Sequence, residues 1–255
     1  MKLSPLAARE PAHPDGAAES MYVHTDGARI HYVVRGDAAA EPLVVLHGNG
    51  EDHATLAAQI AAFAREFRVI AIDSRGHGRS TAGSVPWDFP LLARDTCAVL
   101  DAEGVRSARL FGYSDGGNTI LQMLLDHPQR VRSAVVVGAN LDPAGLHPWA
   151  RASMVAQKML LGVVSRRLPC VRRSVRKLAL MTDHPRIDPV RLRHAEVPVL
   201  VMAGEHDVIR AGHTALIARS LPASELHIMA GAGHDIPMAR AVECAQRALD
   251  FLRDA

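Results

Sequence analysis

A serine, an aspartate and a histidine at three separate points of the chain could together carry out nucleophilic catalysis. Ser114 lies within GYSDGG (112–117), Asp207 follows the apolar run PVLVMAG, and His234 lies in a glycine-flanked loop after the next run, ELHIMA. A serine hydroxyl is a poor nucleophile unless a histidine takes its proton and an acid holds that histidine. We therefore predict that Ser114 attacks a carbonyl carbon, that His234 shuttles the proton and that Asp207 orients the imidazole.

The setting of Ser114 favours this role over a structural one. A G-x-S-x-G match is weak by itself, because a serine after a glycine turn could simply cap a helix. Here the motif ends a strand expected over 108–113 and begins an amphipathic helix expected over 115–127, and this arrangement forces the serine into a tight turn. Gly112 and Gly116 are small where the two backbones nearly touch. The pattern predicts a nucleophile on a strained turn.

Other residues could fill the acid and base positions. Asp142 also follows a strand and is the alternative acid, whereas His227 lies inside a strand and His206 immediately precedes Asp207. His234 alone could be an ordinary surface histidine. We favour Asp207 and His234 because both follow strands in the order serine, acid, histidine, and the carboxyl ends of parallel strands gather functional loops.

A carbonyl attacked by Ser114 would develop an oxyanion, which needs backbone N–H donors. In PLVVLHGNG (42–50) the strand ends at His47 and Gly48. We predict that the N–H groups of Asn49 and Asp115 hold the oxyanion, and the side-chain amide of Asn49 could add a third donor. HGNG could also be an ordinary strand-exit turn, since Asn-Gly is a common turn pair.

The carboxylate of Asp115 directly follows the nucleophile and would oppose catalysis if it pointed at the oxyanion. It is therefore expected to point elsewhere. In one interpretation it lies in the first turn of the helix, where free N–H groups favour an acidic side chain. In the other it faces the pocket and binds a cationic group of the substrate.

Eight short apolar runs must position these residues. They alternate with segments of helical spacing, and this alternation predicts an α/β fold: a mostly parallel eight-stranded sheet with helices on both faces. The first two runs are separated by DGA and predict an antiparallel hairpin. The runs are YVHT, RIHYVVR, PLVVLH, RVIAID, ARLFGYS, SAVVVGA, PVLVMAG and ELHIMA. Helices are expected over 54–66, 88–103, 115–127, 211–220 and 239–253.

More than fifty residues separate SAVVVGA from PVLVMAG, which is far more than an ordinary loop of an α/β unit. Within them, apolar positions that step by three and four predict an amphipathic helix over 169–181, with Arg172, Arg173, Arg176 and Lys177 on its other face. We expect residues 141–196 to form a small helical cap on a core of residues 21–140 and 197–255. Residues 1–20 are expected to form a flexible arm.

The net charge of +2 conceals an asymmetry. The segment 151–193 holds eleven Lys or Arg and two Asp, whereas the rest of the chain holds 18 basic and 25 acidic residues. A basic cap favours anionic substrates or an acidic surface, although a charged helix face is more often just its solvated side. No aromatic residue is interleaved with this basic segment, which disfavours nucleic-acid binding.

Several other classes of protein are disfavoured. No segment approaches the roughly 18 apolar residues of a membrane-spanning helix, and the N-terminus lacks the apolar stretch of a secretory signal. Cys97, Cys170 and Cys244 are far apart and in no C-x-x-C pattern, so we expect no disulfide and a cytoplasmic location. The histidines show no metal-ligand spacing, so neither a metal nor another cofactor is expected. The oligomeric state is not indicated.

Five motifs follow one another in the order typical of one family: HGNG, DSRGHGRS (73–80), GYSDGG, GEHD and GAGH. On these residues the chain resembles the α/β-hydrolase fold family from about Tyr22 to Phe251. The resemblance implies a triad of Ser114, Asp207 and His234 and hydrolysis of a small carboxylic ester without a cofactor. DSRGHGRS is expected to shape a loop beside the pocket.

The nucleophile position separates branches of that family. Serine at position 114 differs from the haloalkane dehalogenase and epoxide hydrolase branches, whose nucleophile is a carboxylate. GYSDGG looks like the motif of the biphenyl-hydrolase-like and valacyclovir-hydrolase-like enzymes, which suggests the α-ammonium of an aminoacyl ester as the partner of Asp115. The same constellation serves amidases, C–C hydrolases and perhydrolases, and a ligand-binding protein without turnover stays open.

Overall fold

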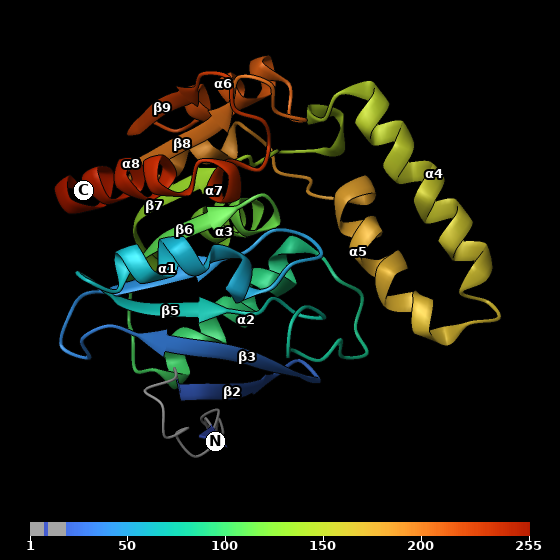
Figure 1. Cartoon of the computed structure of the whole chain (residues 1–255), viewed down its shortest axis with the longest axis horizontal. Helices are drawn as coiled ribbons and strands as arrows, with labels where there is room; N and C mark the ends of the chain where they lie inside the picture. The colour runs from blue at the N-terminus through green and yellow to red at the C-terminus, as the bar shows by residue number, and fades with distance from the viewer. Residues whose placement is uncertain (1–7, 10–18) are drawn as a thin grey trace.

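The computed structural model describes residues 8–9 and 19–255, and in these residues nine strands form one sheet (Figure 1). Their order across the sheet is β1-β2-β3-β5-β4-β6-β7-β8-β9. The strands are β1 (Ala8–Arg9), β2 (Glu19–Thr25), β3 (Ala28–Arg35), β4 (Pro42–Leu46), β5 (Arg68–Ile72), β6 (Ala108–Tyr113), β7 (Val131–Val137), β8 (Val199–Gly204) and β9 (Ser224–Met229).

The sheet is antiparallel at one edge and parallel elsewhere. β2 and β3 form a hairpin through Asp26 and Gly27, both with positive φ, and β3 runs antiparallel to β5. From β5 through β9 all neighbouring strands are parallel. The predicted mostly parallel fold is confirmed, and each of the eight predicted runs is a strand; the two-residue β1 is an addition at the edge.

Helices and short 3-10 turns connect the strands. The helices are α1 (Ala57–Phe63), α2 (Phe89–Ala102), α3 (Asp115–Asp126), α4 (Pro148–Val164), α5 (Arg172–Asp183), α6 (Ala211–Ser220), α7 (Ile236–Ala239) and α8 (Ala241–Asp254). The 3-10 turns are η1 (His53–Leu56), η2 (Pro128–Arg130), η3 (Pro143–Gly145), η4 (Pro169–Val171) and η5 (Arg191–His194).

Three helical predictions differ from the structure, and the first is the helix expected over 54–66, which begins as the 3-10 turn η1 and continues as α1. The helix expected over 239–253 breaks at Arg240, which separates α7 from α8. α4 was not predicted as a helix, because its apolar residues lie around most of its circumference and give no one-sided pattern. The helix expected over 169–181 begins as the 3-10 turn η4 and continues as α5.

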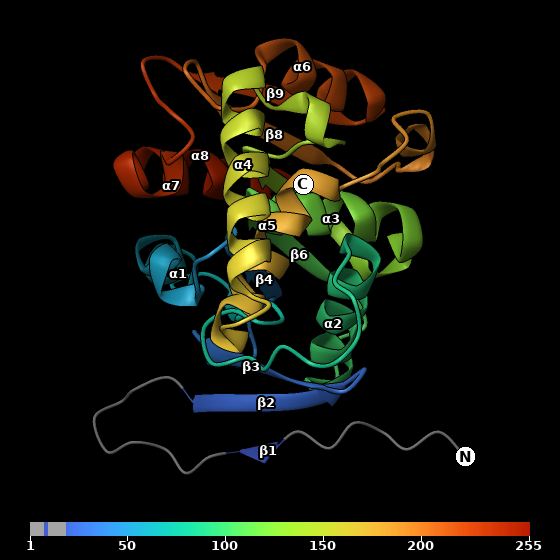
Figure 2. The ribbon, with the colours of Figure 1, turned by 90° about the vertical axis from the view of Figure 1, so that its right-hand side faces the viewer.

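Alternation along the strands builds a core on each face of the sheet (Figure 2). In β4, Val44 and Leu46 pack with residues of α2, α3 and α6, whereas Leu43 and Val45 pack with residues of α1 and α8. Because both faces are covered, the parallel strands are apolar throughout rather than alternating with polar residues.

α4 and α5 form a helical hairpin that projects beyond the carboxyl ends of the parallel strands (Figure 1). Of the segment expected as a cap, 141–196, this hairpin is the part that stands away from the core; Ile187, Leu192 and Ala195 pack in the main core. Among the described residues, no helix is both long and apolar enough to cross a bilayer. Of the arm expected over 1–20, residues 8–9 and 19–20 lie in strands, and the remainder falls outside the described residues.

Candidate active site

Ser114 occupies the turn between β6 and α3 in a strained conformation, with φ 53° and ψ −116°. Its N–H donates to the carbonyl oxygen of Val137 at 2.7 Å, which fixes the turn to β7. Its side chain makes no capping hydrogen bond to α3, so the alternative interpretation as a helix cap is wrong. A non-glycine residue held at positive φ is costly and is found where function requires it.

The glycines around Ser114 are needed because backbones touch there. A Cβ atom on Gly112 would lie 2.5 Å from the carbonyl group of Gly116, and one on Gly116 would lie 2.3 Å from the carbonyl oxygen of Leu46. Both distances are too short for a side chain. The close packing of β4, β6 and α3 therefore requires a sharp turn at the end of β6, and Ser114 lies on this turn and lines the cavity.

The structure brings Ser114, His234 and Asp207 together. His234 Nε2 lies 3.1 Å from Ser114 Oγ, and His234 Nδ1 lies 2.8 Å from Asp207 Oδ1. Asp207 and His234 come from the loops that follow β8 and β9. With Nδ1–H donating to the carboxylate, Nε2 is free to accept the serine proton, which is the arrangement that general-base catalysis requires.

The buried carboxylate of Asp207 is held in place by the backbone. Its Oδ1 also accepts the N–H of Ile209 at 2.9 Å. The alternative acid, Asp142, instead accepts the N–H of Ala144 at 2.6 Å and caps η3. His227 is on β9. The structure thus gives Asp142 a local role in starting a turn.

The loop that contains Asn49 is fixed on both sides of the predicted oxyanion donor. His47 Nδ1–H donates to the carbonyl oxygen of Gly48 at 2.7 Å, and His47 Nε2 accepts the N–H of Ser74 at 3.0 Å. Burial lowers the pKa of His47, so it is neutral. Within the described part of the chain, neither the N–H of Asn49 nor that of Asp115 donates to a protein group. Both residues line the same cavity as Ser114.

The side chain of Asn49 links Asp115 to the cap. Its Nδ2 donates to Asp115 Oδ2 at 2.7 Å and to the backbone carbonyl oxygen of Lys177 on α5 at 2.9 Å. Both amide hydrogens are therefore used. The expectation that this amide could be a third oxyanion donor is wrong for this reason.

Asp115 is the first residue of α3, and its carboxylate is buried at the wall of the cavity, with 8% of the residue exposed. Burial raises the pKa of Asp115 to about 6, against the opposing effects of the hydrogen bond from Asn49 and the nearby His234. At neutral pH the group is mostly ionised. Asp115 thus lies at the helix start and also lines the cavity, and the binding of a cationic group stays a prediction.

A cavity of about 290 Å³ lies between the core and the cap hairpin. One wall is polar and includes Glu51, which sequence reasoning missed although it lies only two residues after Asn49. Burial raises the pKa of Glu51, whose Oε2 accepts the N–H of Gly48 at 3.1 Å. The lining also has an apolar part, which consists of Leu146, Met154, Met181, Val208 and Ile209. A small molecule with a polar and an apolar end fits this division.

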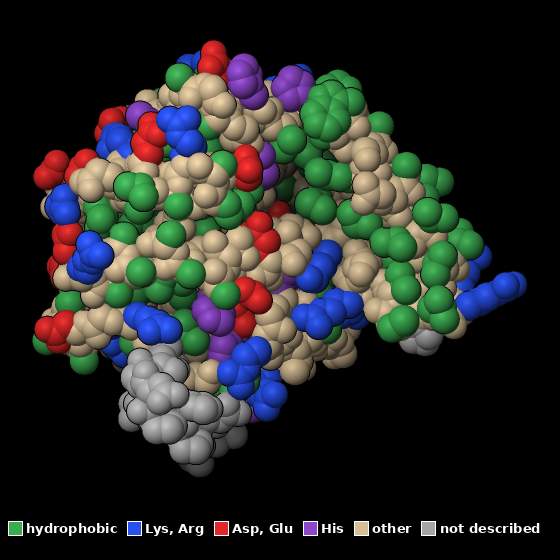
Figure 3. Space-filling model, viewed as in Figure 1, with side chains coloured by type: hydrophobic (Ala, Val, Ile, Leu, Met, Phe, Trp, Pro, Cys, Tyr) green, Lys and Arg blue, Asp and Glu red, His purple; other side chains and the backbone are tan. Residues whose placement is uncertain are grey.

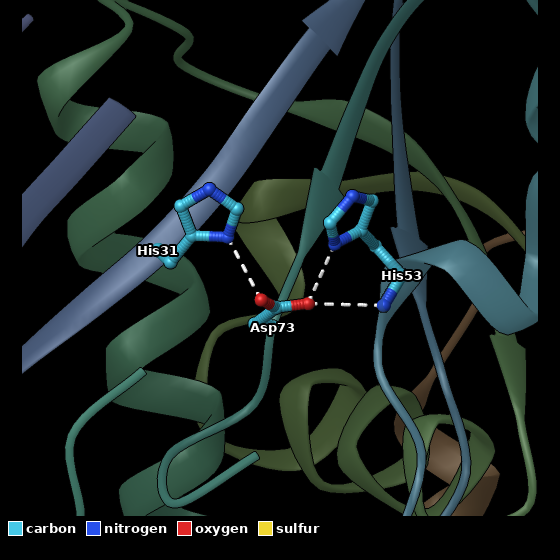
Figure 4. Close-up of side chains that lie close together, drawn as sticks. All are labelled: His31, His53 and Asp73. Carbon is cyan, nitrogen blue, oxygen red and sulfur yellow. Dashed lines mark hydrogen bonds and ion pairs between the residues drawn. The ribbon is translucent and has the colours of Figure 1, made fainter. Parts of the chain in front are cut away.

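Residues 47–52, which we call the Asn49 loop, connect β4 to η1. A cluster of His31, His53 and Asp73 holds the end of this loop at η1 (Figure 4). Asp73 Oδ2 accepts His31 Nδ1–H at 2.8 Å and the N–H of Arg79 at 2.8 Å, and its Oδ1 accepts His53 Nδ1–H at 2.7 Å and the N–H of His53 at 2.9 Å. Burial alone would raise the pKa of Asp73, but these four donors lower it far below its usual range.

The chemistry of this cluster is that of a hydrogen-bonded anchor. His31, His53 and Asp73 are close enough to be considered as metal ligands. However, both imidazoles present Nδ1–H to the carboxylate, and both carboxylate oxygens are already occupied by two donors each. The three residues come from β3, η1 and the loop after β5, so no spacing in the sequence could have revealed the cluster. It fits the expected role of DSRGHGRS in shaping the loop beside the pocket.

Comparison with known proteins places this geometry in a family. A model of the alpha/beta hydrolase fold matches residues 41–160. The chain is also 32% identical over 254 residues to the dihydrolipoyllysine-residue acetyltransferase component of an acetoin cleaving system from Pseudomonas putida, covering 89% of this chain and 67% of that protein. The chain belongs to the α/β-hydrolase fold family.

Esterases are among the relatives of this α/β-hydrolase fold protein. Carboxylesterase YbfK of Bacillus subtilis is 28% identical, with 92% of this chain and 88% of that protein covered. The solved structure of Est816, described as an N-acyl homoserine lactone degrading enzyme, superposes with a TM-score of 0.75 at 29% identity over 90% of this chain and 99% of that one. Hydrolase chemistry is thus the activity that the family supports.

Proposed function

We propose that this α/β-hydrolase fold protein is a cofactor-independent serine hydrolase of small carboxylic esters. The observation that carries the proposal is the position of His234, which lies within hydrogen-bond reach of both Ser114 and Asp207. The name of one relative, a carboxylesterase, supports the bond type. A second relative degrades an N-acyl homoserine lactone, a small molecule that contains a cyclic carboxylic ester and an amide. The three free cysteines support a cytoplasmic location as part of the proposal.

The proposed reaction has two halves. Ser114 Oγ attacks the ester carbonyl carbon while His234 Nε2 takes the hydroxyl proton, and the N–H groups of Asn49 and Asp115 stabilise the oxyanion. Collapse of the tetrahedral intermediate breaks the ester bond, and His234 returns its proton to the leaving alcohol. Water, deprotonated by His234, then attacks the acyl-enzyme and releases the acid and Ser114. Asp207 holds the imidazole and stabilises its protonated form.

The test combines turnover with covalent labelling. Wild type is expected to hydrolyse p-nitrophenyl esters of short acids and to react with a fluorophosphonate at Ser114, and Ser114→Ala is expected to do neither. Ser153→Ala is the matched control, because Ser153 is exposed on α4 and outside the cavity lining. If wild type neither turned over any ester nor reacted with the fluorophosphonate, the protein would instead be a ligand-binding member of the family.

The polar wall suggests the kind of substrate. We propose that Asp115 binds a cationic group such as the α-ammonium of an aminoacyl ester, because Asp115 and Glu51 give this wall two carboxylates. Asp115→Asn keeps the shape and the acceptor for Asn49 but removes the charge. It is expected to lower kcat/KM about tenfold or more on aminoacyl p-nitrophenyl esters and to leave neutral esters nearly unchanged. An equal loss of kcat/KM on aminoacyl and neutral esters would contradict the proposal that Asp115 binds the cationic group.

A further inference from the structure

The outer face of α4 is apolar where a surface helix is normally polar. Six residues at helical spacing lie on this face and are exposed: Trp149, Ala152, Ala156, Met159, Leu160 and Val163. Trp149, Met159 and Leu160 are each 66% exposed, and Val163 is 64% exposed. We call these six residues the α4 stripe. The opposite side of α4 contacts α5 and contributes Met154 to the cavity, so the stripe is not needed to attach the helix.

The stripe lies on the outside of the molecule. Figure 3 shows hydrophobic side chains gathered along the hairpin, with Lys or Arg side chains at its lower end. Figure 2 shows that α4 is the outermost element on this side, with α5 behind it. A patch of large apolar side chains on one outward helix face marks a surface that binds something apolar.

The charges around the stripe are mostly positive; the exception on the hairpin is Asp183, which pairs with Lys158. Residues 148–182 include eight Lys or Arg and no Asp or Glu. Arg166 and Arg167 follow α4 directly and are exposed, as is Arg172 at the start of α5. Within the described residues, none of these three side chains forms an ion pair. By contrast, Arg173 and Arg176 donate to backbone carbonyl oxygens of the core and attach the hairpin.

An apolar helix face flanked by arginines matches the interface of an anionic bilayer. Apolar side chains of such a helix enter the headgroup and acyl boundary, while arginines contact lipid phosphates. A tryptophan at one end of the stripe suits the same boundary. We propose that the α4 stripe, with Arg166, Arg167 and Arg172, docks this protein on the surface of an anionic phospholipid membrane.

A second copy of the chain is a poorer occupant of the stripe. A symmetric dimer would place two stripes together, and neither stripe has an acidic residue that could pair with the arginines of the other. The rest of the chain carries an excess of acidic residues, so an anionic membrane attracts the hairpin and repels the remainder of the molecule. The charge distribution therefore orients the protein with the cap toward the lipid.

Tryptophan fluorescence tests this docking directly, without requiring turnover. The chain has two tryptophans, and Trp87 is buried whereas Trp149 lies on the stripe. With vesicles of phosphatidylglycerol and phosphatidylcholine, Trp149 emission is expected to shift to the blue and to be quenched by lipids brominated on their acyl chains. Vesicles of phosphatidylcholine alone are expected to bind much more weakly, and added salt to weaken binding to the anionic vesicles.

Variants separate the apolar contribution to vesicle binding from the electrostatic one, in a sedimentation assay with the same vesicles. Met159→Ser/Leu160→Ser/Val163→Ser is expected to weaken binding about tenfold or more, and Arg166→Glu/Arg167→Glu about a hundredfold. The matched controls are Met238→Ser/Val242→Ser and Arg65→Glu/Arg219→Glu, which change exposed residues far along the chain from α4 and are expected to bind like wild type.

Three outcomes would overturn the proposal. The first is the absence of anionic-vesicle binding by wild type. The second is an equal loss of binding in the stripe variants and the controls. The third is a dimer in analytical ultracentrifugation that the stripe variant dissociates, because the stripe would then be covered by a second copy. Hydrolysis of soluble esters by the stripe variant is expected to match wild type, so a failure here is distinguishable from a failure of the proposed esterase activity.

Discussion

At the scale of single residues, the position of each side chain in the proposed triad depends on a partner that fixes its orientation. Asp207 accepts both the imidazole N–H of His234 and the backbone N–H of Ile209, so its carboxylate cannot rotate freely. Ser114 is fixed by backbone strain and by its N–H bond to Val137. His234 is the one member held mainly by its neighbour, which makes the orientation of its ring sensitive to Asp207.

Asp207→Asn tests this dependence. The amide would donate to Nδ1 and place the imidazole proton on Nε2, where it can no longer accept the serine proton. We expect kcat on a p-nitrophenyl ester to fall by about 10³ to 10⁴, with the rate of fluorophosphonate labelling falling in parallel. Asp142→Asn is the control and is expected to be nearly as active as wild type. If Asp142→Asn were the more damaged variant, the acid would be wrongly assigned.

At the scale of elements, the Asn49 loop is the point where the sheet, α3 and the cap meet. The cluster of Asp73 with His31 and His53 holds the far end of the loop, and His47 holds its start. The side chain of Asn49 then reaches α5 through the carbonyl oxygen of Lys177. A hydrogen bond therefore connects α5 of the cap to Asn49, the residue whose N–H is proposed to stabilise the oxyanion.

Asn49→Ala would remove the side-chain hydrogen bonds to Asp115 and Lys177 and keep the backbone N–H. The carboxylate of Asp115 would lose a donor and α5 would lose its attachment to the loop, so we expect a loss of about 1 to 3 kcal/mol in unfolding free energy. Amide hydrogen exchange is expected to accelerate in α5 more than in α8. The exposed Arg172→Ala on the same helix is the control. Unchanged exchange in α5 would show that Arg173 and Arg176 hold the cap without Asn49.

At the scale of the whole molecule, the fold could be predicted from the sequence. A parallel sheet covered on both faces requires continuous apolar strands, and such runs are easily recognised between polar segments. The proposed site followed from the fold, since Ser114, Asp207 and His234 each follow a strand whose carboxyl end lies at the same edge. The cluster of His31, His53 and Asp73 was missed because its members come from separate elements. Glu51 was missed because the HGNG motif ends before it. α4 was missed because its outer face is apolar, which removes the polar side that normally reveals a surface helix.

Stability against pH is a property of the whole molecule to which buried carboxyl groups contribute with different signs. Donors hold the pKa of Asp73 low, so its contribution is present above the unfolded pKa and lost as pH falls. Asp115 is the opposite case, because burial raises its pKa from 3.8 to about 6. The folded state then binds more protons than the unfolded state, so this contribution is present at low pH and is lost as pH rises toward 6 and beyond.

Asp115→Asn should therefore stabilise the protein at neutral pH even if it damages substrate binding. Removing the cost of burying a charge is expected to raise the unfolding free energy by about 2 kcal/mol at pH 7, and the gain should shrink toward pH 4.5, where wild-type Asp115 is largely protonated. Urea unfolding of both proteins at the two pH values measures the difference. Asp95, whose pKa burial also raises to about 6, is present in both proteins and cancels in the comparison.

A gain in unfolding free energy that did not depend on pH would mean that the shape of the side chain rather than its charge is responsible. A loss at pH 7 would mean that the ionised carboxylate stabilises the fold through its bond with Asn49.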